Sequence, residues 1–426
     1  MGVKKLDATI KYDPLYWTML CIFLIPQFVF VFFQQSSLAS GMMVAIIPIY
    51  IYGLRYMKNL AFPSGRILLF SIVIFMLLAQ SGYIAAMYDN YKPLFTLPAL
   101  VIVLFGAILF SNRLLTTDPD TLASAFRAVT YTLLLLGWLS VIYRIDIGNY
   151  AAKPKAVFPF SEESHYALTV GIFVCASGIL MKNRERMILM ANLLLQALIF
   201  PSLTLLVFCM MAIFVFWMSR RITLMLTIIV VLVAAVYVML TYFSDLPAIA
   251  YFGSRLAIND DTDNLTTLVF LQGVDDAKNA LLESHYLGLG LQMAGTNSVG
   301  KYGYIIQSLA GNDFNRTDGG FLASKIVSEF GAIGLLLSIG YLWVLKKAVN
   351  TINHISDNTD TESTLLKIAM AVIIAYAVEF FLRGYGYFSP GLFLFATMMM
   401  VSSKLYYQQT SVERPQVSPA SIRPQS

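Results

Sequence analysis

The stretch that decides the fold class is "LFTLPALVIVLFGAILF", residues Leu94–Phe110, which contains no charged side chain. A helix needs about 20 apolar residues to cross the hydrocarbon core of a bilayer, and fewer where its neighbours thin the bilayer. The composition agrees, since 58% of the 426 residues are hydrophobic and only 12% are charged. Soluble domains carry about a quarter charged residues. The sequence therefore predicts an all-α polytopic membrane protein.

Similar apolar runs recur along the chain and predict about twelve transmembrane helices. Two of these runs, Met187–Phe200 and Leu203–Met218, are short and meet at Pro201, so they could instead form one kinked element. The predicted spans are Tyr16–Phe33, Leu38–Leu54, Ile67–Met87, Leu94–Phe110, Ala123–Ile142, Tyr166–Met181, Met187–Phe200, Leu203–Met218, Ile222–Phe243, Phe321–Leu345, Leu365–Leu382 and Phe388–Leu405.

Basic residues predict the orientation of these spans. With the N-terminus in the cytoplasm, about 19 of the 29 Lys and Arg residues fall on the cytoplasmic side, mostly in short loops, where the positive-inside rule places them. The chain is then organised as nine helices in 1–243, a large outer loop in 244–320, three helices in 321–405 and a polar, disordered tail in 406–426. Both termini are predicted to be cytoplasmic. No basic run with interleaved aromatic residues indicates nucleic-acid binding.

The large outer loop is predicted to contain a helix of its own. "TDNLTTLVFLQGVDDAKNALLES", Thr262–Ser284, offers Asp263 as an N-cap and places apolar side chains near one face. We expect this amphipathic helix to lie at the outer membrane–water boundary. The glycines of "GLGLQMAG", Gly288–Gly295, are expected to end it.

A polar cluster precedes one of the predicted spans. "FPFSEESHYALTV", Phe158–Val170, holds Glu162, Glu163 and His165 at the mouth of a helix. Capping by Ser161 or Ser164, with acidic residues favoured by the helix dipole, would explain the serines and glutamates, but it does not require the histidine. His285 lies in the same three-letter pattern, "ESH", later in the outer loop.

Three arginines lie on the outer side, where the positive-inside rule disfavours them: Arg255, Arg316 and Arg383. Each has polar and aromatic neighbours, in "YFGSRLA", "NDFNRTDGGF" and "FLRGYGYFSP". A lone outer arginine is usually solvated or snorkels towards water. Three arginines near helix ends could also converge on one anion, because the guanidinium fork donates two parallel hydrogen bonds to phosphate.

The segment "NRTDGGFLASKIVSEFGAIG", Asn315–Gly334, leads from the outer loop into a span. It places Asp318 at a helix start, next to backbone N–H groups suited to anions. Lys325 and Glu329 stand four residues apart on that span. This spacing is typical of an intrahelical ion pair, which lowers the cost of both charges in a membrane.

The order of these motifs resembles the Wzy-type O-antigen polymerases of bacterial polysaccharide assembly. The resemblance also includes "LGLGLQ" late in the outer loop, whereas Glu163 stands where proline is frequent in that family. The related O-antigen ligases usually show a histidine near the start of the span after the large loop, where this chain has Arg316 and Asp318. The matching positions are Glu162, Ser164, His165, Arg255, Asp318, Gly319, Glu329, Gly331, Gly334 and Arg383.

The resemblance implies glycosyl transfer at the periplasmic face of the bacterial inner membrane, between oligosaccharide repeat units on undecaprenyl diphosphate. The product would be O-antigen or a related surface polysaccharide, the partners would include membrane lipids and a chain-length regulator, and neither cofactor nor metal would be needed. The catalytic candidates are Asp318, Glu162 and His165, with Asp318 preferred as base; the diphosphate-binding candidates are Arg255, Arg316 and Arg383; His285 and Tyr387 are further substrate contacts.

Three other functions stay open from the sequence. An O-antigen ligase would share the architecture. A flippase for lipid-linked oligosaccharides also has about a dozen spans, but it should carry charge deep within them along its path. A non-catalytic assembly subunit would tolerate loss of Arg255 or Arg383.

Overall fold

The computed structural model describes residues 14–53, 64–143, 147–153, 155–218, 242, 264–313, 315–355 and 360–412. Within these ranges the chain is helical and has no β-strand, only an isolated bridge between Val157 and Phe160. Six of the described helices are long and apolar enough to cross a membrane. The protein is therefore a helical membrane protein, and the count of twelve spans remains a prediction.

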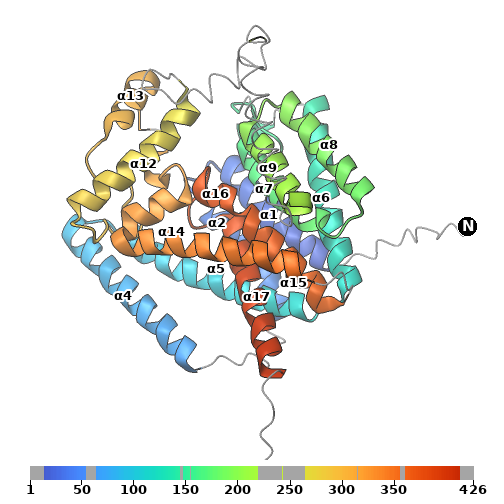
Figure 1. Ribbon diagram of the computed structural model, residues 1–426. Helices are drawn as coiled ribbons and strands as arrows, with labels where there is room; N and C mark the ends of the chain where they lie inside the picture. The colour runs from blue at the N-terminus through green and yellow to red at the C-terminus, as the bar shows by residue number, and fades with distance from the viewer. Residues whose placement is uncertain are drawn as a thin grey trace, which may run out of the picture.

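The first part of the bundle (Figure 1) follows the predicted spans, with one exception. The predicted span 38–54 is broken at Ile46 into two short helices, α2 and α3. Pro48 has no backbone N–H and cannot donate to the carbonyl of residue 44, which accounts for the break. The helices are α1 (Pro14–Phe32), α2 (Ala39–Ala45), α3 (Ile47–Gly53), α4 (Ser64–Tyr88), α5 (Lys92–Leu115) and α6 (Pro119–Ile142).

The two short runs around Pro201 form two antiparallel helices, not one kinked element. These are α8 (Asn183–Ile199) and α9 (Leu203–Ile213), and α9 continues into a π-helical turn at Phe214–Met218. Arg186, near the start of α8, donates from Nη1 to the carbonyl of Phe216 at 3.4 Å. The predicted span 222–243 lies outside the described residues, apart from Tyr242.

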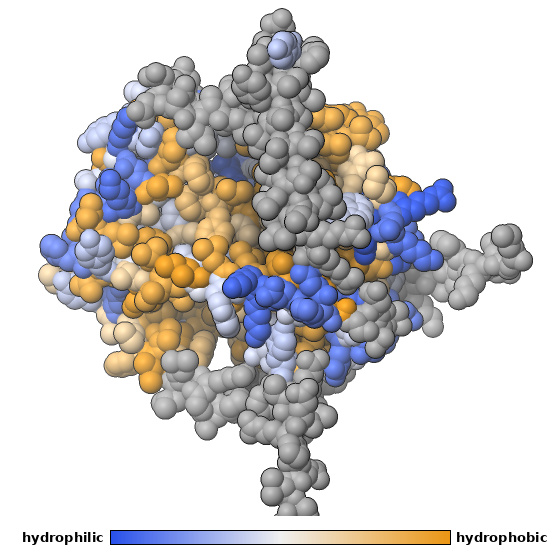
Figure 2. All heavy atoms as spheres, in the orientation of Figure 1, coloured by the Kyte–Doolittle hydropathy of each residue, from blue (hydrophilic) through white to orange (hydrophobic). Residues whose placement is uncertain are grey.

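The centre of the bundle is formed by α7 (Glu163–Gly178) and α15 (Thr361–Ala375), which pack against each other. Every residue of α7 from Tyr166 to Gly178 is buried. Apolar side chains also cover much of the outer surface visible in Figure 2. Phe75 is 71% exposed and Leu336 is 67% exposed, as expected for helices that face lipid.

The outer-loop helix is present as α12 (Leu265–Glu283), and it is followed by α13 (Lys301–Ala310). Asn264, not the predicted Asp263, is the N-cap, because its Oδ1 accepts from the N–H of Thr266 at 3.0 Å. Asp263 itself lies outside the described residues. The buried face of α12 packs against α13 and α14, on one side of the bundle (Figure 1). Its placement at a membrane boundary remains a prediction.

The last helices are α14 (Leu322–His354), α16 (Ala377–Phe381), which continues α15, and α17 (Pro390–Val412). Gly331 interrupts α14, with φ 58° and ψ −130°. The glycine-rich segment after α12, which is predicted to end that helix, inserts its backbone at this break and satisfies the freed groups. The N–H of Leu289 donates to the carbonyl of Ser328 at 2.9 Å, and the N–H of Gly290 donates to the carbonyl of Glu329 at 2.8 Å. The N–H of Ala332 donates to the carbonyl of Tyr286 at 2.8 Å.

The bundle has two ends of different character. One end, here called the loop end, carries the described residues of segments 147–153, 155–162, 264–313, 315–320 and 382–389. These segments contact one another and the end of α1. The other, here called the basic end, carries cations bound to helix ends. Arg127 donates to the carbonyl of Leu180 at 3.3 Å, and Arg186 donates to the carbonyl of Gly178 at 2.9 Å. Lys404 donates to the side chain of Asn112. That the basic end faces the cytoplasm remains a prediction.

Candidate functional site

The loop end brings together Glu162, His165 and Arg383, here called the Glu162 cluster. Arg383 donates from Nη2 to Glu162 Oε1 at 2.5 Å, although the two residues are 221 positions apart. His165 Nε2 lies 3.1 Å from the same oxygen. His165 is one helical turn beyond Glu162, so the two side chains share a face at the start of α7. Glu162 thus contacts two other predicted site residues directly.

Two serines hold this cluster, but neither caps the helix. Glu162 occupies the N-cap position of α7 and makes no capping bond. Ser161 Oγ lies 2.6 Å from His165 Nδ1, and Ser164 donates to Glu162 Oε1. The alternative that these serines serve only as caps is therefore wrong. Among the described residues, the contacts of the carboxylate all involve Oε1, and within this part of the chain Oε2 is left able to receive a ligand hydroxyl.

The charges of the cluster follow from burial and from Arg383. Partial burial raises the pKa of Glu162, but His165 and Arg383 outweigh burial and hold that pKa below its usual range. Burial lowers the pKa of His165 to about 4, against the opposing effect of Glu162. Arginine stays charged at any accessible pH, so its effect on Glu162 persists when the imidazole is neutral. At neutral pH the cluster combines a carboxylate, a neutral imidazole and a guanidinium.

A second polar set is joined by Tyr387, at the other end of the segment 383–387. Tyr387 donates to Glu329 Oε2 at 2.7 Å. Lys325 Nζ lies 3.4 Å from Glu329 Oε1 and donates to the carbonyl of Thr317 at 2.5 Å. The predicted ion pair between Lys325 and Glu329 is therefore present, and it also holds the turn that precedes α14. Asp318 is exposed beside this set, with Oδ1 3.9 Å from the position of a Cβ on Gly386.

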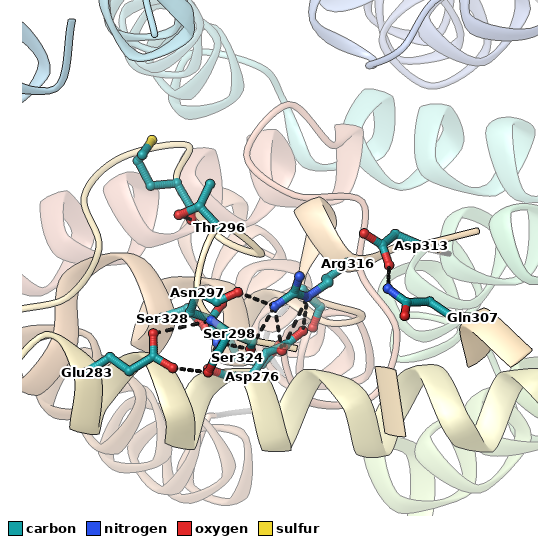
Figure 3. Close-up of polar contacts among 12 residues, drawn as sticks. Asp276, Glu283, Thr296, Asn297, Ser298, Gln307, Asp313, Arg316, Ser324 and Ser328 are labelled. Atoms are coloured by element: carbon teal, nitrogen blue, oxygen red, sulfur yellow. Dashed lines mark hydrogen bonds and ion pairs between the residues drawn. The ribbon is translucent and has the colours of Figure 1, made fainter. Parts of the chain in front are cut away.

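Arg316 is bound within the protein, and its predicted role in diphosphate binding stays a prediction. Its side chain is 7% exposed, and its Nε lies 3.3 Å from Asp276 Oδ2. It also donates to the carbonyls of Asn297 at 2.5 Å and Ser298 at 2.9 Å (Figure 3). These bonds join the turn before α14 to α12 and to the loop that follows it. The guanidinium is used within the protein, so the prediction that Arg316 binds diphosphate gains no support.

Two further predicted residues, Arg255 and His285, remain untested as parts of the site. Arg255 lies outside the described residues. His285 is exposed just after α12, in a left-handed conformation with φ 51°. No contact between His285 and the Glu162 cluster is found among the described residues, and its role as a substrate contact stays a prediction.

No family model matches this chain, and no curated protein matches it either. The resemblance to the O-antigen polymerases therefore rests on the motifs alone, and the function has to be argued from the chemistry of the site.

Sequence reasoning missed a layer of polar groups behind the cluster. Tyr385 packs against His165, with ring centroids 4.0 Å apart and the rings tilted by 47°, and Gln27 and Glu379 lie close to it. Burial raises the pKa of Tyr385 well above its usual value. The Tyr385 hydroxyl, the Gln27 amide and Glu379 Oε1 are buried without a hydrogen-bond partner in the described protein. Such groups usually bond to water or a ligand. The only available signal was a lone Gln or Glu in an apolar run.

The arrangement has the groups that a phosphate-dependent transfer needs. Arg383 can donate to a phosphate oxygen, since its side chain is partly exposed and its fork suits phosphate. Oε2 of Glu162 can orient a hydroxyl, and the exposed carboxylate of Asp318 can accept a proton. Arg383 begins the short segment 383–387, and Asp318 lies beside Gly386 of the same segment.

Proposed function

We propose that this protein is a membrane glycosyltransferase that polymerises oligosaccharide repeat units carried on undecaprenyl diphosphate. The observation that carries the proposal is the contact of Glu162 with both Arg383 and His165 at the loop end. It joins a cation for a diphosphate with groups that can orient a hydroxyl. The apolar helices around it provide a surface for polyprenyl chains.

The proposed reaction assigns one step to each group. The acceptor hydroxyl attacks the anomeric carbon of the donor sugar, and a new C–O bond forms as the bond to the diphosphate breaks. The diphosphate leaves with the electron pair, and Arg383 stabilises its charge. The hydroxyl proton passes to Asp318, while Glu162 and His165 orient the acceptor. The product is one repeat unit longer and remains attached to the lipid diphosphate of the acceptor.

The positions of buried charges support an enzyme over a flippase. In the described part of the chain, the buried charged side chains are Asp276, Arg316, Lys325, Glu329 and Glu379. All five lie in or near the segments of the loop end. A carrier is expected to place such charges in a column through the membrane.

The test is incubation of the purified full-length protein with lipid-linked repeat units, followed by sizing of the glycan. We expect a ladder of products from the wild type and none from Arg383→Ala. Arg184→Gln is the matched control, because Arg184 is exposed at the start of α8, away from the loop end. A normal ladder from both Arg383→Ala and Glu162→Gln would overturn the proposed function. Transfer of glycan to a lipid A acceptor without elongation would identify a ligase instead.

A further inference from the structure

A cavity of about 420 Å³ lies at the basic end, between the first turn of α1 and the last turns of α3 and α5. This volume is within the usual range for small-molecule sites. α1 runs from this cavity at Pro14 to the loop end at Phe32, about 1.5 Å per residue. The cavity is therefore separate from the Glu162 cluster.

The walls of the cavity change in character from the inside to the mouth. Leu15, Ile49 and Phe110 line it and are each buried. Asn112 and Arg113 line it near the end of α5. A ligand that fits both parts has an apolar portion and a polar head.

The polar part of this cavity is cationic. Arg113 is exposed and makes no ion pair among the described residues. Lys404, on α17, donates to the side chain of Asn112 and so adds a second positive charge beside the lining. No Asp or Glu lines the cavity in the described part of the chain. The site therefore favours an anionic head.

We propose that this cavity binds an anionic phospholipid, with the phosphodiester at Arg113 and Lys404 and an acyl chain against the apolar wall. Basic pockets between transmembrane helices suit lipid head groups of this kind. A free phosphate ion would leave the apolar wall without a partner. Tyr52, 49% exposed at the rim, is the residue type that settles at the membrane–water interface. The proposal does not depend on the glycosyltransferase activity.

The test is native mass spectrometry of the delipidated full-length protein, titrated separately with phosphatidylglycerol and with phosphatidylcholine of the same acyl chains. We expect a saturable phosphatidylglycerol adduct, weakened about fivefold in Arg113→Gln, since one basic residue near a lipid surface contributes about that much. Arg184→Gln removes an equivalent charge away from the cavity and should bind as the wild type does. Thermal unfolding with each lipid checks that the variants are folded.

Three results would overturn the proposal. Equal binding of phosphatidylglycerol by the wild type and Arg113→Gln would exclude the cavity as its site. Equal binding of both lipids by the wild type would exclude recognition of the anionic head. Competition by inorganic phosphate at the concentration of the lipid would identify a site for a phosphate ion instead.

Discussion

Tyr387 donates a hydrogen bond to Glu329 at 2.7 Å, and this bond fixes one end of the segment whose other end is Arg383. Arg383 in turn donates to Glu162 at 2.5 Å. A stretch of five residues thus connects a carboxylate at the start of α7 with one in the first turns of α14. The loop end is held by side chains from distant parts of the sequence, and this arrangement leads to four predictions.

The first prediction separates charge from geometry at the Glu162 cluster. Arg383→Lys keeps the positive charge but loses the planar fork, so we expect polymerisation to fall by about 10²-fold and not to vanish. Glu162→Gln should lose a similar factor because its amide cannot keep the ion pair. The measurement is the initial rate of glycan elongation by folded protein. If Arg383→Lys elongates at the wild-type rate, the fork has no role in binding the diphosphate.

The second prediction concerns the break in α14. A Cβ at Gly331 would clash with the carbonyl oxygen of Tyr286, and φ at this position is 58°. We therefore expect Gly331→Ala to reduce the free energy of unfolding by about 1–3 kcal/mol or more. A Cβ at Gly340, on the same helix, would meet no other atom within 4 Å, so Gly340→Ala should be neutral or stabilising. The comparison is made by thermal unfolding in detergent, and equal effects of the two substitutions would contradict the described break.

The third prediction tests whether Arg316 is structural. Removing one partner of a buried ion pair leaves the other uncompensated, so Arg316→Gln and Asp276→Asn should each cost about 3–5 kcal/mol of stability. The double variant should lose less than the sum, because the two residues interact directly. Chemical unfolding of the three variants provides the measurement. A stable Arg316→Gln protein with no elongation activity would instead return Arg316 to the diphosphate site.

The fourth prediction is a loss of stability in acid. The pKa of His165 is lowered from 6.5 to about 4 in the folded protein. Between these two pH values, His165 is therefore protonated in the unfolded chain but neutral in the folded protein. Stability from this residue is therefore complete above pH 6.5 and declines as the pH falls towards 4, by up to about 1.4 kcal/mol per pH unit. The lowered pKa of Glu162 acts in the same direction at lower pH.

The measurement is the unfolding midpoint between pH 7 and pH 4.5. His165→Asn should flatten the slope below pH 6.5, whereas Arg184→Gln, which changes an exposed residue away from the loop end, should leave it unchanged because arginine does not titrate in this range. The same slope in the wild type and in His165→Asn would show that another group is responsible.

Much of the candidate site could be named from the sequence, because charge is rare in this chain and each polar cluster stands out. Glu162, His165 and Arg383 are recognisable in this way, and the structure places them in contact. The same reasoning did not foresee the ion pair of Arg316, since a sequence does not show that Asp276 lies opposite it. It also missed Tyr385 and Gln27, whose neighbours in the sequence give no reason to pair them.

The sequence by itself determined that this is a helical membrane protein and where many of its helices run. A membrane-spanning helix needs an apolar segment of sufficient length, and it satisfies its backbone groups within that segment. Both conditions are local, so a single stretch such as Leu94–Phe110 is enough to predict such a helix. Only the tertiary structure decided which carboxylate meets Arg383 and how the backbone at Gly331 is satisfied. Those contacts depend on how the helices pack against one another. The apolar surfaces of transmembrane helices are so similar that the sequence pattern does not specify which helices become neighbours.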